Sequence, residues 1–205
     1  MNTPASIVSG NVIPEEDEKW NVEFKDVTLK NGRVSFTANH GEITAIVGTT
    51  GCGKSTLLSY ITRFAMPESG EIIIGGRGAE EYDLEHLRKN ISFAQSKPVL
   101  FSKTLRENLL LHGAPDNADV MVQALKEARC DFIATQKEDL KKFLINKGEN
   151  YSGGQKSRIA VAGAIAKKAK VYVFLLFAPR CPYLKVGSEQ THNPISYISD
   201  TFLLF

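Results

Sequence analysis

A glycine-rich stretch at residues 48–56, GTTGCGKST, constrains the fold of this chain more than any other feature. It matches the pattern G-x-x-x-x-G-K-[ST], with a β-rich run before it and apolar residues at helical spacing after it. Glycines in such a loop let successive backbone N–H groups point inward at phosphate oxygens, and the N-terminus of the following helix adds a partial positive charge. Strand, loop and helix together predict a phosphate-binding loop in an α/β fold.

The same motif predicts what the loop residues do. Lys54 is expected to reach the β- and γ-phosphates of a nucleotide, and the Ser55 hydroxyl is expected to bind Mg²⁺. The predicted nucleotide-binding residues are Gly48, Thr49, Thr50, Gly51, Cys52, Gly53, Lys54, Ser55 and Thr56. A GTPase is disfavoured because no Asp is followed three residues later by Gly, and the partial guanine motif at 146–149 stands alone.

Composition narrows the class of protein. The 205 residues carry 25 Lys plus Arg and 23 Asp plus Glu, and this formal charge of +2 argues against a nucleic-acid partner. Apolar residues make up 42% of the chain, enough for one core and a small second lobe. Three scattered cysteines favour a reducing compartment over a disulfide framework or a zinc site. The longest apolar run is too short to span a bilayer, and the first ten residues lack a secretory signal.

Hydrophobic periodicity predicts the order of the elements. The expected strands lie at 22–29, 34–38, 42–48, 70–76, 90–95 and 171–177, the first two in an antiparallel sheet. The expected helical stretches lie at 54–64, 83–90, 104–112, 118–129, 130–143 and 153–169. The middle of the chain has few strand signals and is interpreted as an inserted helical lobe. Residues 1–21 contain an acidic run and are expected to form a solvated linker that includes Trp20.

A second motif, YSGGQ at 151–155, comes before the last helical stretch. It resembles the L-S-G-G-Q signature of the nucleotide-binding domains of ABC transporters, the ATP-binding cassette family. The stretch ISFAQSKPVLF around Gln95 resembles the Q-loop of the same family, particularly its exporter branch. The resemblance runs from about residue 22 to residue 174, and two independent motifs occur in the family's order.

The resemblance implies ATP and Mg²⁺ as ligands, with Ser55 and Gln95 contacting the metal and Gln95 also linking nucleotide state to a transmembrane domain. It implies a second partner, another nucleotide-binding domain paired head to tail. In such a pair the signature of one domain caps the γ-phosphate held by the other. The signature residues acting in trans are Ser152, Gly153, Gly154 and Gln155. The expected location is the cytoplasmic face of a membrane, held there by the partner, or the soluble cytoplasm without one.

The expected fold is a P-loop NTPase core, a parallel sheet with flanking helices, carrying an antiparallel β subdomain and an inserted helical subdomain, incomplete at the C-terminus. A linker at 1–21 precedes the nucleotide-binding domain at 22–177, whose helical subdomain covers about 96–158. The tail at 178–205 does not resemble the family. It is what a frameshift, an alternative exon or a truncated copy would produce.

One departure from the family pattern bears on catalysis. The family carries two acidic residues at the end of the strand that follows the signature helix, and hydrolysis of ATP needs them. Leu175 and Leu176 stand at those positions, and no Asp or Glu occurs between Glu149 and Glu189. His192 lacks the context of the family's switch histidine. No catalytic residue is therefore identified, and ATP hydrolysis is expected to be impaired.

Three smaller departures from the family pattern concern the stacking of adenine, the residue before the signature and the helix after it. No aromatic residue stands where the family stacks one on adenine, and Asn146 replaces the usual Glu before the signature. Gly163 replaces an Arg, which predicts a weaker helix because an interior glycine costs about 1 kcal/mol relative to alanine.

Three functional readings remain open. The chain is a competent ABC ATPase whose acids come from elsewhere, a domain that binds Mg·ATP but hydrolyses it poorly or not at all, or a non-enzymatic fragment. The second is preferred here.

Overall fold

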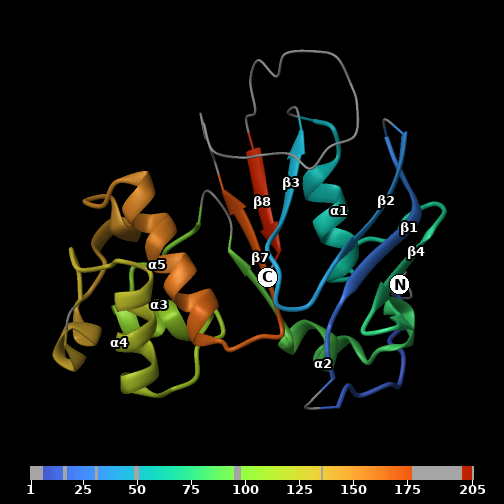
Figure 1. Ribbon diagram of the computed structural model, residues 1–205. Coiled ribbons are helices and arrows are strands. Elements are labelled where there is room, and N and C mark those ends of the chain that lie inside the picture. Colours follow the sequence, from blue (N-terminus) through green and yellow to red (C-terminus); the bar gives the residue numbers. More distant parts are fainter. Residues whose placement is uncertain are drawn as a thin grey trace, which may run out of the picture.

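The computed structural model describes residues 7–15, 18–30, 32–48, 51–94, 98–134, 136–176 and 200–204, with the backbone alone for 175, 176 and 200–204. The described residues form two sheets and a helical lobe, with the helical lobe on one side of the core sheet and the antiparallel sheet on the other (Figure 1). The predicted α/β fold, with its antiparallel β subdomain and its helical subdomain, is confirmed.

The antiparallel sheet has the strand order β2-β1-β4-β5. Its strands are β1 (Val22–Leu29), β2 (Gly32–Ala38), β4 (Glu71–Ile74) and β5 (Arg77–Gly78). Val22, Phe24 and Val27 of β1 are all buried, although strict alternation would turn the last of them outward. A shift in the register between Phe24 and Val27 brings all three to the core.

The N-terminal segment is not the solvated linker that its charge suggests. Trp20 is only 2% exposed and its ring packs on Tyr82, with the centroids 5.7 Å apart. The backbone of Gly10 and Val12 forms hydrogen bonds with residues 81–83. The prediction of Trp20 as a linker residue was wrong because an acidic run says nothing about the apolar side chain beside it, which tertiary contacts bury.

The core sheet has the strand order β3-β8-β7-β6. Its strands are β3 (Thr44–Gly48), β6 (Ile91–Ala94), β7 (Val171–Leu176) and β8 (Asp200–Leu204). β6 and β7 pair in parallel, and β8 pairs antiparallel with both β3 and β7, so β3, β6 and β7 all run in one direction. Figure 1 shows β8 lying between β3 and β7 and pointing the opposite way. Strand β8 is not predicted from the sequence, because the tail that contains it shows no convincing hydrophobic period.

Helices α1 (Lys54–Ile61) and α2 (Leu84–Lys89) flank the core sheet, with a single 3-10 turn, η1 (Ala79–Glu81), before α2. Leu57, Leu58 and Ile61 of α1 are buried in one hydrophobic cluster with residues of β1, β4 and β7. Their spacing of one, three and four residues places them on one helix face, as predicted. α1 therefore joins the two sheets through a single core.

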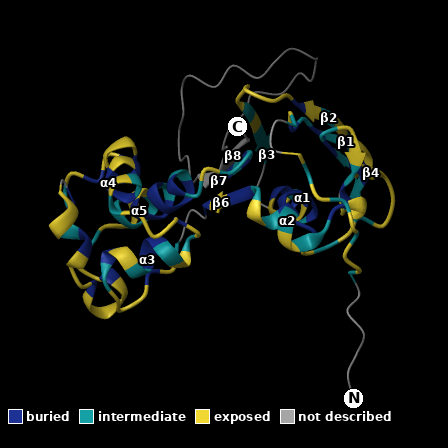
Figure 2. Ribbon diagram, turned by 90° about the horizontal axis from the view of Figure 1, so that it is seen from below, coloured by how far each residue is buried: buried dark blue, intermediate teal, exposed yellow. Residues whose placement is uncertain are grey.

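The helical lobe has a core of its own (Figure 2). It contains α3 (Leu105–Leu111), α4 (Ala118–Glu127) and α5 (Gly153–Ala166), with 3-10 turns η2 (Lys137–Lys141) and η3 (Ile145–Gly148). The helical pattern read at 130–143 was wrong, since apart from η2 the described residues there form turns and irregular chain. Cys130 and Ile133 are buried although they lie outside any helix, and Leu140 is buried within η2, because all three pack into the core of the lobe. In the described part of the chain, none of the helices has the length and hydropathy to cross a bilayer.

Gly163 of α5 lies where α3 ends. A Cβ built on Gly163 would lie 2.5 Å from Cβ of His112, closer than real side chains approach. Glycine at this position is therefore a packing requirement, and the local weakness it brings to the helix allows α3 and α5 to come close.

Candidate nucleotide-binding site

The glycine-rich loop follows β3 directly and leads into α1, as the sequence predicts. Gly51 and Gly53 have φ of 82° and 107°, in the left-handed region that side chains with a Cβ disfavour. A Cβ on Gly48 would meet Sγ of Cys52 at 2.7 Å. The backbone of the loop thus depends on glycine at Gly53, which the motif fixes, and at Gly51, which it does not. Thr49 and Thr50 lie outside the described residues.

The first turn of α1 differs from those of the other described α-helices. α2, α3, α4 and α5 each have an N-cap side chain that accepts a backbone hydrogen bond, whereas α1 begins at Gly53 with no such cap and no acidic residue in its first turn. Helix N-terminal N–H groups that lack a capping partner bind anions well. Gly53 provides no side chain to cap this turn, so no N-cap side chain occupies the place where phosphate oxygens would bind.

Lys54 places a cation at the same loop. Its side chain is 7% exposed, and Nζ donates to the carbonyl oxygen of Gly48 at 2.7 Å and to Sγ of Cys52 at 3.5 Å. Ser55 and Thr56 are exposed on the first turn of α1. A nearly buried ammonium, uncapped amides and exposed hydroxyls form a set of donors that fits a polyphosphate with its Mg²⁺.

Three strands of the core sheet end at the edge where the glycine-rich loop begins. β3 ends at Gly48, β6 ends at Ala94, and β7 ends at Leu176, all at the carboxyl edge of the parallel strands. Ligands of open α/β sheets bind at such an edge. Gln95 follows Ala94 immediately in the sequence but lies outside the described residues, as does His192.

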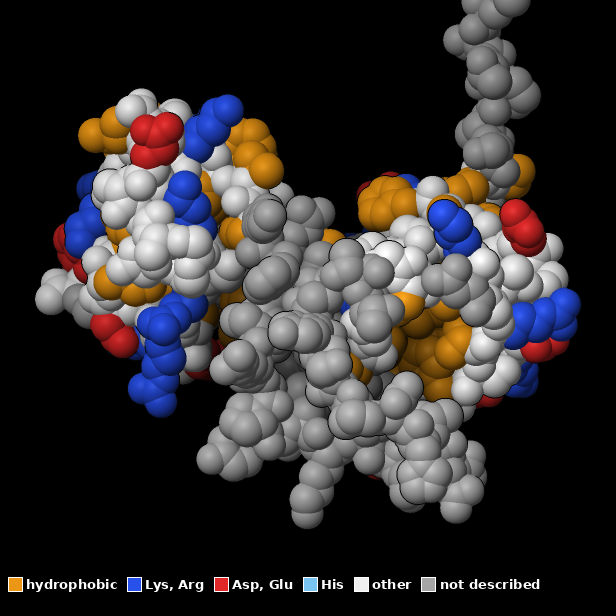
Figure 3. All heavy atoms as spheres, turned by 90° about the horizontal axis from the view of Figure 1, so that it is seen from above, with side chains coloured by type: hydrophobic (Ala, Val, Ile, Leu, Met, Phe, Trp, Pro, Cys, Tyr) orange, Lys and Arg blue, Asp and Glu red, His pale blue; other side chains and the backbone are white. Residues whose placement is uncertain are grey.

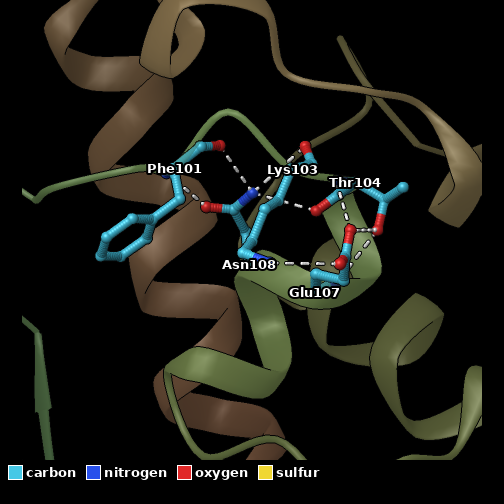
Figure 4. Close-up of polar contacts among 5 residues, drawn as sticks. All are labelled: Phe101, Lys103, Thr104, Glu107 and Asn108. Atoms are coloured by element: carbon cyan, nitrogen blue, oxygen red, sulfur yellow. Dashed lines mark hydrogen bonds and ion pairs between the residues drawn. The ribbon is translucent and has the colours of Figure 1, made fainter.

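Residues that follow Gln95 are fixed by a hydrogen-bonded network at the start of α3 (Figure 4). Asn108 is fully buried; its Oδ1 accepts from the backbone N–H of Phe101 at 2.8 Å, and its Nδ2 donates to the carbonyl of Thr104 at 2.9 Å. Thr104 and Glu107 form a reciprocal capping box. The segment just beyond the Q-loop is therefore held firmly to the helical lobe.

The signature lies at the first turn of α5. Oγ of Ser152 accepts from the backbone N–H of Gln155 at 3.2 Å, and Oε1 of Gln155 accepts from the N–H of Ser152 at 2.8 Å. Gly153 and Gly154 are exposed, have no positive φ, and would meet no atom closer than 4.0 Å if they carried a Cβ. The described fold gives no reason for glycine at either position, although glycine costs a helix about 0.5–1 kcal/mol relative to alanine.

The chain does not bring its own signature to its own phosphate loop. α1 and α5 lie on opposite sides of the core sheet in both Figures 1 and 2. Figure 3 looks down onto the carboxyl edge, with the helical lobe on the left, the antiparallel sheet on the right, and charged side chains on the outer surfaces of both. The glycine-rich loop and the signature are therefore at separate places on the chain.

Leu175 and Leu176 are the last two residues of β7, at the carboxyl edge. Their backbone pairs with Phe202 and Thr201 of β8. The next residue of β8, Asp200, pairs with Gly48 at the start of the glycine-rich loop. Sequence reasoning did not connect Asp200 with the site; the only signal was the short β-prone run DTFLL that it begins.

Comparison with known proteins agrees with this geometry. The sequence model of the ABC transporter family matches residues 32–174. The chain belongs to the ABC transporter family. It is 32% identical over 176 residues to a sophorolipid transporter of Starmerella bombicola, covering 79% of this chain and 14% of that protein.

Two further relatives have a similar sequence identity to this chain and a similar coverage. The chain is 36% identical over 149 residues to ABC transporter B family member 1 of Arabidopsis thaliana, covering 72% of this chain and 11% of that protein. The chain is 35% identical over 170 residues to multidrug resistance protein 1 of Entamoeba histolytica, and the match covers 78% of this chain and 13% of that protein. The chain spans 14% or less of each of these relatives. Its matched region is the ATP-binding domain of an ABC transporter.

Proposed function

We propose that the chain binds Mg·ATP through its glycine-rich loop and hydrolyses it poorly or not at all. The observation that carries the proposal is the uncapped first turn of α1 with Lys54 buried beside it. Mg²⁺ would be held by the Ser55 hydroxyl and Gln95, and the loop residues 48–56 would hold the phosphates. Any capping side chain at α1 would compete with the phosphates for the same amides.

The expected loss of hydrolysis follows from the strand beside the loop. β7 ends in Leu175 and Leu176, where the family pattern has the acids that hold the metal and orient water. No Asp or Glu occurs between Glu149 and Glu189. Without a carboxylate to activate water, phosphoryl transfer to water loses the general base and keeps only electrostatic stabilisation.

The exposed signature supports a second nucleotide-binding domain as partner, in a head-to-tail pair. Ser152, Gly153 and Gly154 would cap the γ-phosphate that the partner holds, and glycine leaves room for the phosphate to approach the backbone. This explains why two exposed glycines occupy a helix turn in which the chain itself does not require them. Gln155 holds the turn in shape through the capping box.

A group of exposed apolar residues on the helical lobe supports a transmembrane domain as the other partner. Val99, Phe101, Phe143 and Ile145 are 45–66% exposed. Their segments are joined by hydrogen bonds from the N–H of Leu144 to the carbonyl of Lys103 and from the N–H of Lys147 to Oγ of Ser102. Exposed apolar groups of this kind mark interaction surfaces, and this one adjoins the segment after Gln95. Through such a partner the chain would be held at the cytoplasmic face of a membrane.

Titration of the purified chain with a fluorescent ATP analogue tests the proposal. Saturable binding is expected, and Lys54→Ala should weaken it at least ten-fold, about 1.4 kcal/mol or more, because a charge-assisted contact to phosphate is lost. Lys126→Ala removes an exposed lysine of α4 and should leave affinity unchanged. Absence of saturable binding in the folded chain, or equal affinity in the Lys54→Ala variant, would contradict the proposal.

Phosphate release separates the remaining alternatives. With the transmembrane partner present, release is expected to stay at background, whereas release above background would favour a competent ATPase. A cooperative thermal melt that ATP shifts upward would exclude a non-functional fragment, because a ligand that binds only the folded state stabilises it.

A further inference from the structure

The hairpin of β1 and β2 borders the first turn of α1. The last residue of β1, Leu29, pairs with the first residue of β2, Gly32, so the turn between the strands is two residues long. A Cβ on Gly53 would lie 3.4 Å from Cδ1 of Leu29. Figure 1 shows this turn at the same end of the molecule as the start of α1. The hairpin therefore lies beside the place at which the glycine-rich loop would hold phosphates.

This turn offers little to a nucleotide base. Proteins recognise a base by stacking it on an aromatic side chain and by hydrogen bonds to its edge. The described residues at the turn are Leu29, Lys30, Gly32 and Arg33, none of which carries an aromatic ring. The guanidinium of Arg33 is paired with Asp26, whose Oδ2 lies 2.6 Å from Nη1. A two-residue connection is also too short to fold over a bound base.

The aromatic side chains of β1, β2 and α1 are packed elsewhere. Phe24 is 1% exposed and stacks on Phe36, with the ring centroids 4.6 Å apart. Since a strand rises about 3.3 Å per residue, Phe36 is roughly 13 Å from Gly32 along β2. Tyr60 is 7% exposed near the C-terminal end of α1, away from the loop. Among the described residues of these three elements, none of the rings is therefore placed to stack on a base at the loop.

The donors at the loop are suited to phosphate. The first turn of α1 has no N-cap side chain, Lys54 supplies an ammonium on a side chain that is 7% exposed, and Ser55 supplies an exposed hydroxyl. All of these groups would contact the part that nucleoside triphosphates have in common. Contacts to phosphate fix the position of a ligand but carry no information about its base.

Given the proposed binding of Mg·ATP, on which this inference rests, we propose that the site selects the triphosphate with its Mg²⁺ and does not select the base. ATP, GTP, UTP and inorganic tripolyphosphate then bind to the same loop with similar affinity. Adenosine, which has the base without the phosphates, does not bind.

Tripolyphosphate separates recognition of the phosphates from recognition of the base. Stacking of one base on an aromatic side chain tightens binding about 5- to 150-fold. A site with such a ring binds ATP more tightly than tripolyphosphate by that factor, because tripolyphosphate has three linked phosphates and no base. A site without the ring binds the two within a small factor.

Isothermal titration calorimetry of the unaltered full chain measures these affinities without a fluorescent label. The ligands are ATP, GTP, UTP, tripolyphosphate and adenosine, each in excess Mg²⁺. The three nucleotides should have dissociation constants within about five-fold of one another, and tripolyphosphate should bind no more than about five-fold more weakly than ATP. Adenosine should give no binding signal. A larger spread among the nucleotides, a larger deficit for tripolyphosphate, or binding of adenosine would overturn the proposal.

The Lys54→Ala variant shows whether the four phosphate ligands use the same loop. Their binding should weaken together, by at least about ten-fold, because each loses the same ammonium. Lys126→Ala, on the exposed surface of α4, should leave all four affinities unchanged. Loss of ATP binding with tripolyphosphate unaffected would also overturn the proposal. Failure of the proposed function itself appears differently, as no binding of any of the four ligands or as binding of all four that Lys54→Ala does not affect.

Discussion

Glycine serves two different purposes in the two motifs of this chain. In the phosphate loop Gly51 and Gly53 adopt left-handed backbone conformations, so the loop cannot form with larger residues. In the signature Gly153 and Gly154 are in an ordinary helical turn with open space around them. The first pair is required by the chain's own fold, whereas the described fold does not require the second, which fits the proposed approach of a partner's phosphate.

Alkylation of cysteine reports on the phosphate loop at the scale of single residues. Cys52 is partly exposed within the loop, whereas Cys130 is fully buried and burial raises the pKa of its thiol to about 12. N-ethylmaleimide should therefore modify Cys52 and spare Cys130, and ATP should protect Cys52. Peptide mass mapping resolves each cysteine. Equal labelling of Cys52 with and without ATP would show that phosphates do not occupy the loop.

At the scale of elements, strand β8 decides how the core sheet closes. β3 and β7 pair with β8 on either side, and no pairing joins β3 directly to β7 in the described sheet. β8 therefore satisfies the backbone groups of both strands and keeps the loop after β3 beside the end of β7. A short strand from the end of the sequence thus sets the geometry of the site.

At Gly163 of helix α5, the higher helix propensity of alanine and the close packing against His112 have opposite effects on stability. Gly163→Ala gains about 1 kcal/mol in helix propensity but forces a Cβ to within 2.5 Å of Cβ of His112, and overpacking costs about 1–3 kcal/mol. We expect a net loss of stability and a lower melting temperature. Gly153→Ala, at an open position of the same helix, should raise the melting temperature. A higher melting temperature for Gly163→Ala would mean that α3 and α5 are packed less closely than described.

At the scale of the whole molecule, the two sequence motifs lie on different lobes. The phosphate loop is on the core sheet and the signature is on the helical lobe, with α1 and α5 on opposite sides of the sheet. Contacts between Ala94, Ala164 and Phe174 join the lobe to the sheet, and Nζ of Lys167 donates to the carbonyls of Arg88 and Ile91. These contacts fix the lobe that carries the signature to the sheet that carries the phosphate loop.

At this scale we predict that two chains pair when Mg·ATP is bound. In Mg·ATP the purified chain should sediment as a dimer, and Gly153→Ala should remain monomeric because its Cβ takes the space of the partner's phosphate. The same variant should melt no lower than the unaltered chain, which separates loss of the interface from loss of the fold. Dimerisation of Gly153→Ala at the original affinity would contradict the head-to-tail arrangement.

The sequence by itself determined the loop, the signature and most elements. Glycine-rich turns and amphipathic helices depend on neighbouring residues, so Gly48–Ser55, α1 and α5 could all be predicted from local pattern. Tertiary structure alone decided the burial of Trp20, the close contact at Gly163 and the irregular chain at 130–134. It also decided the pairing of Asp200 with Gly48, because residues 152 positions apart meet only through strand pairing that no local pattern encodes.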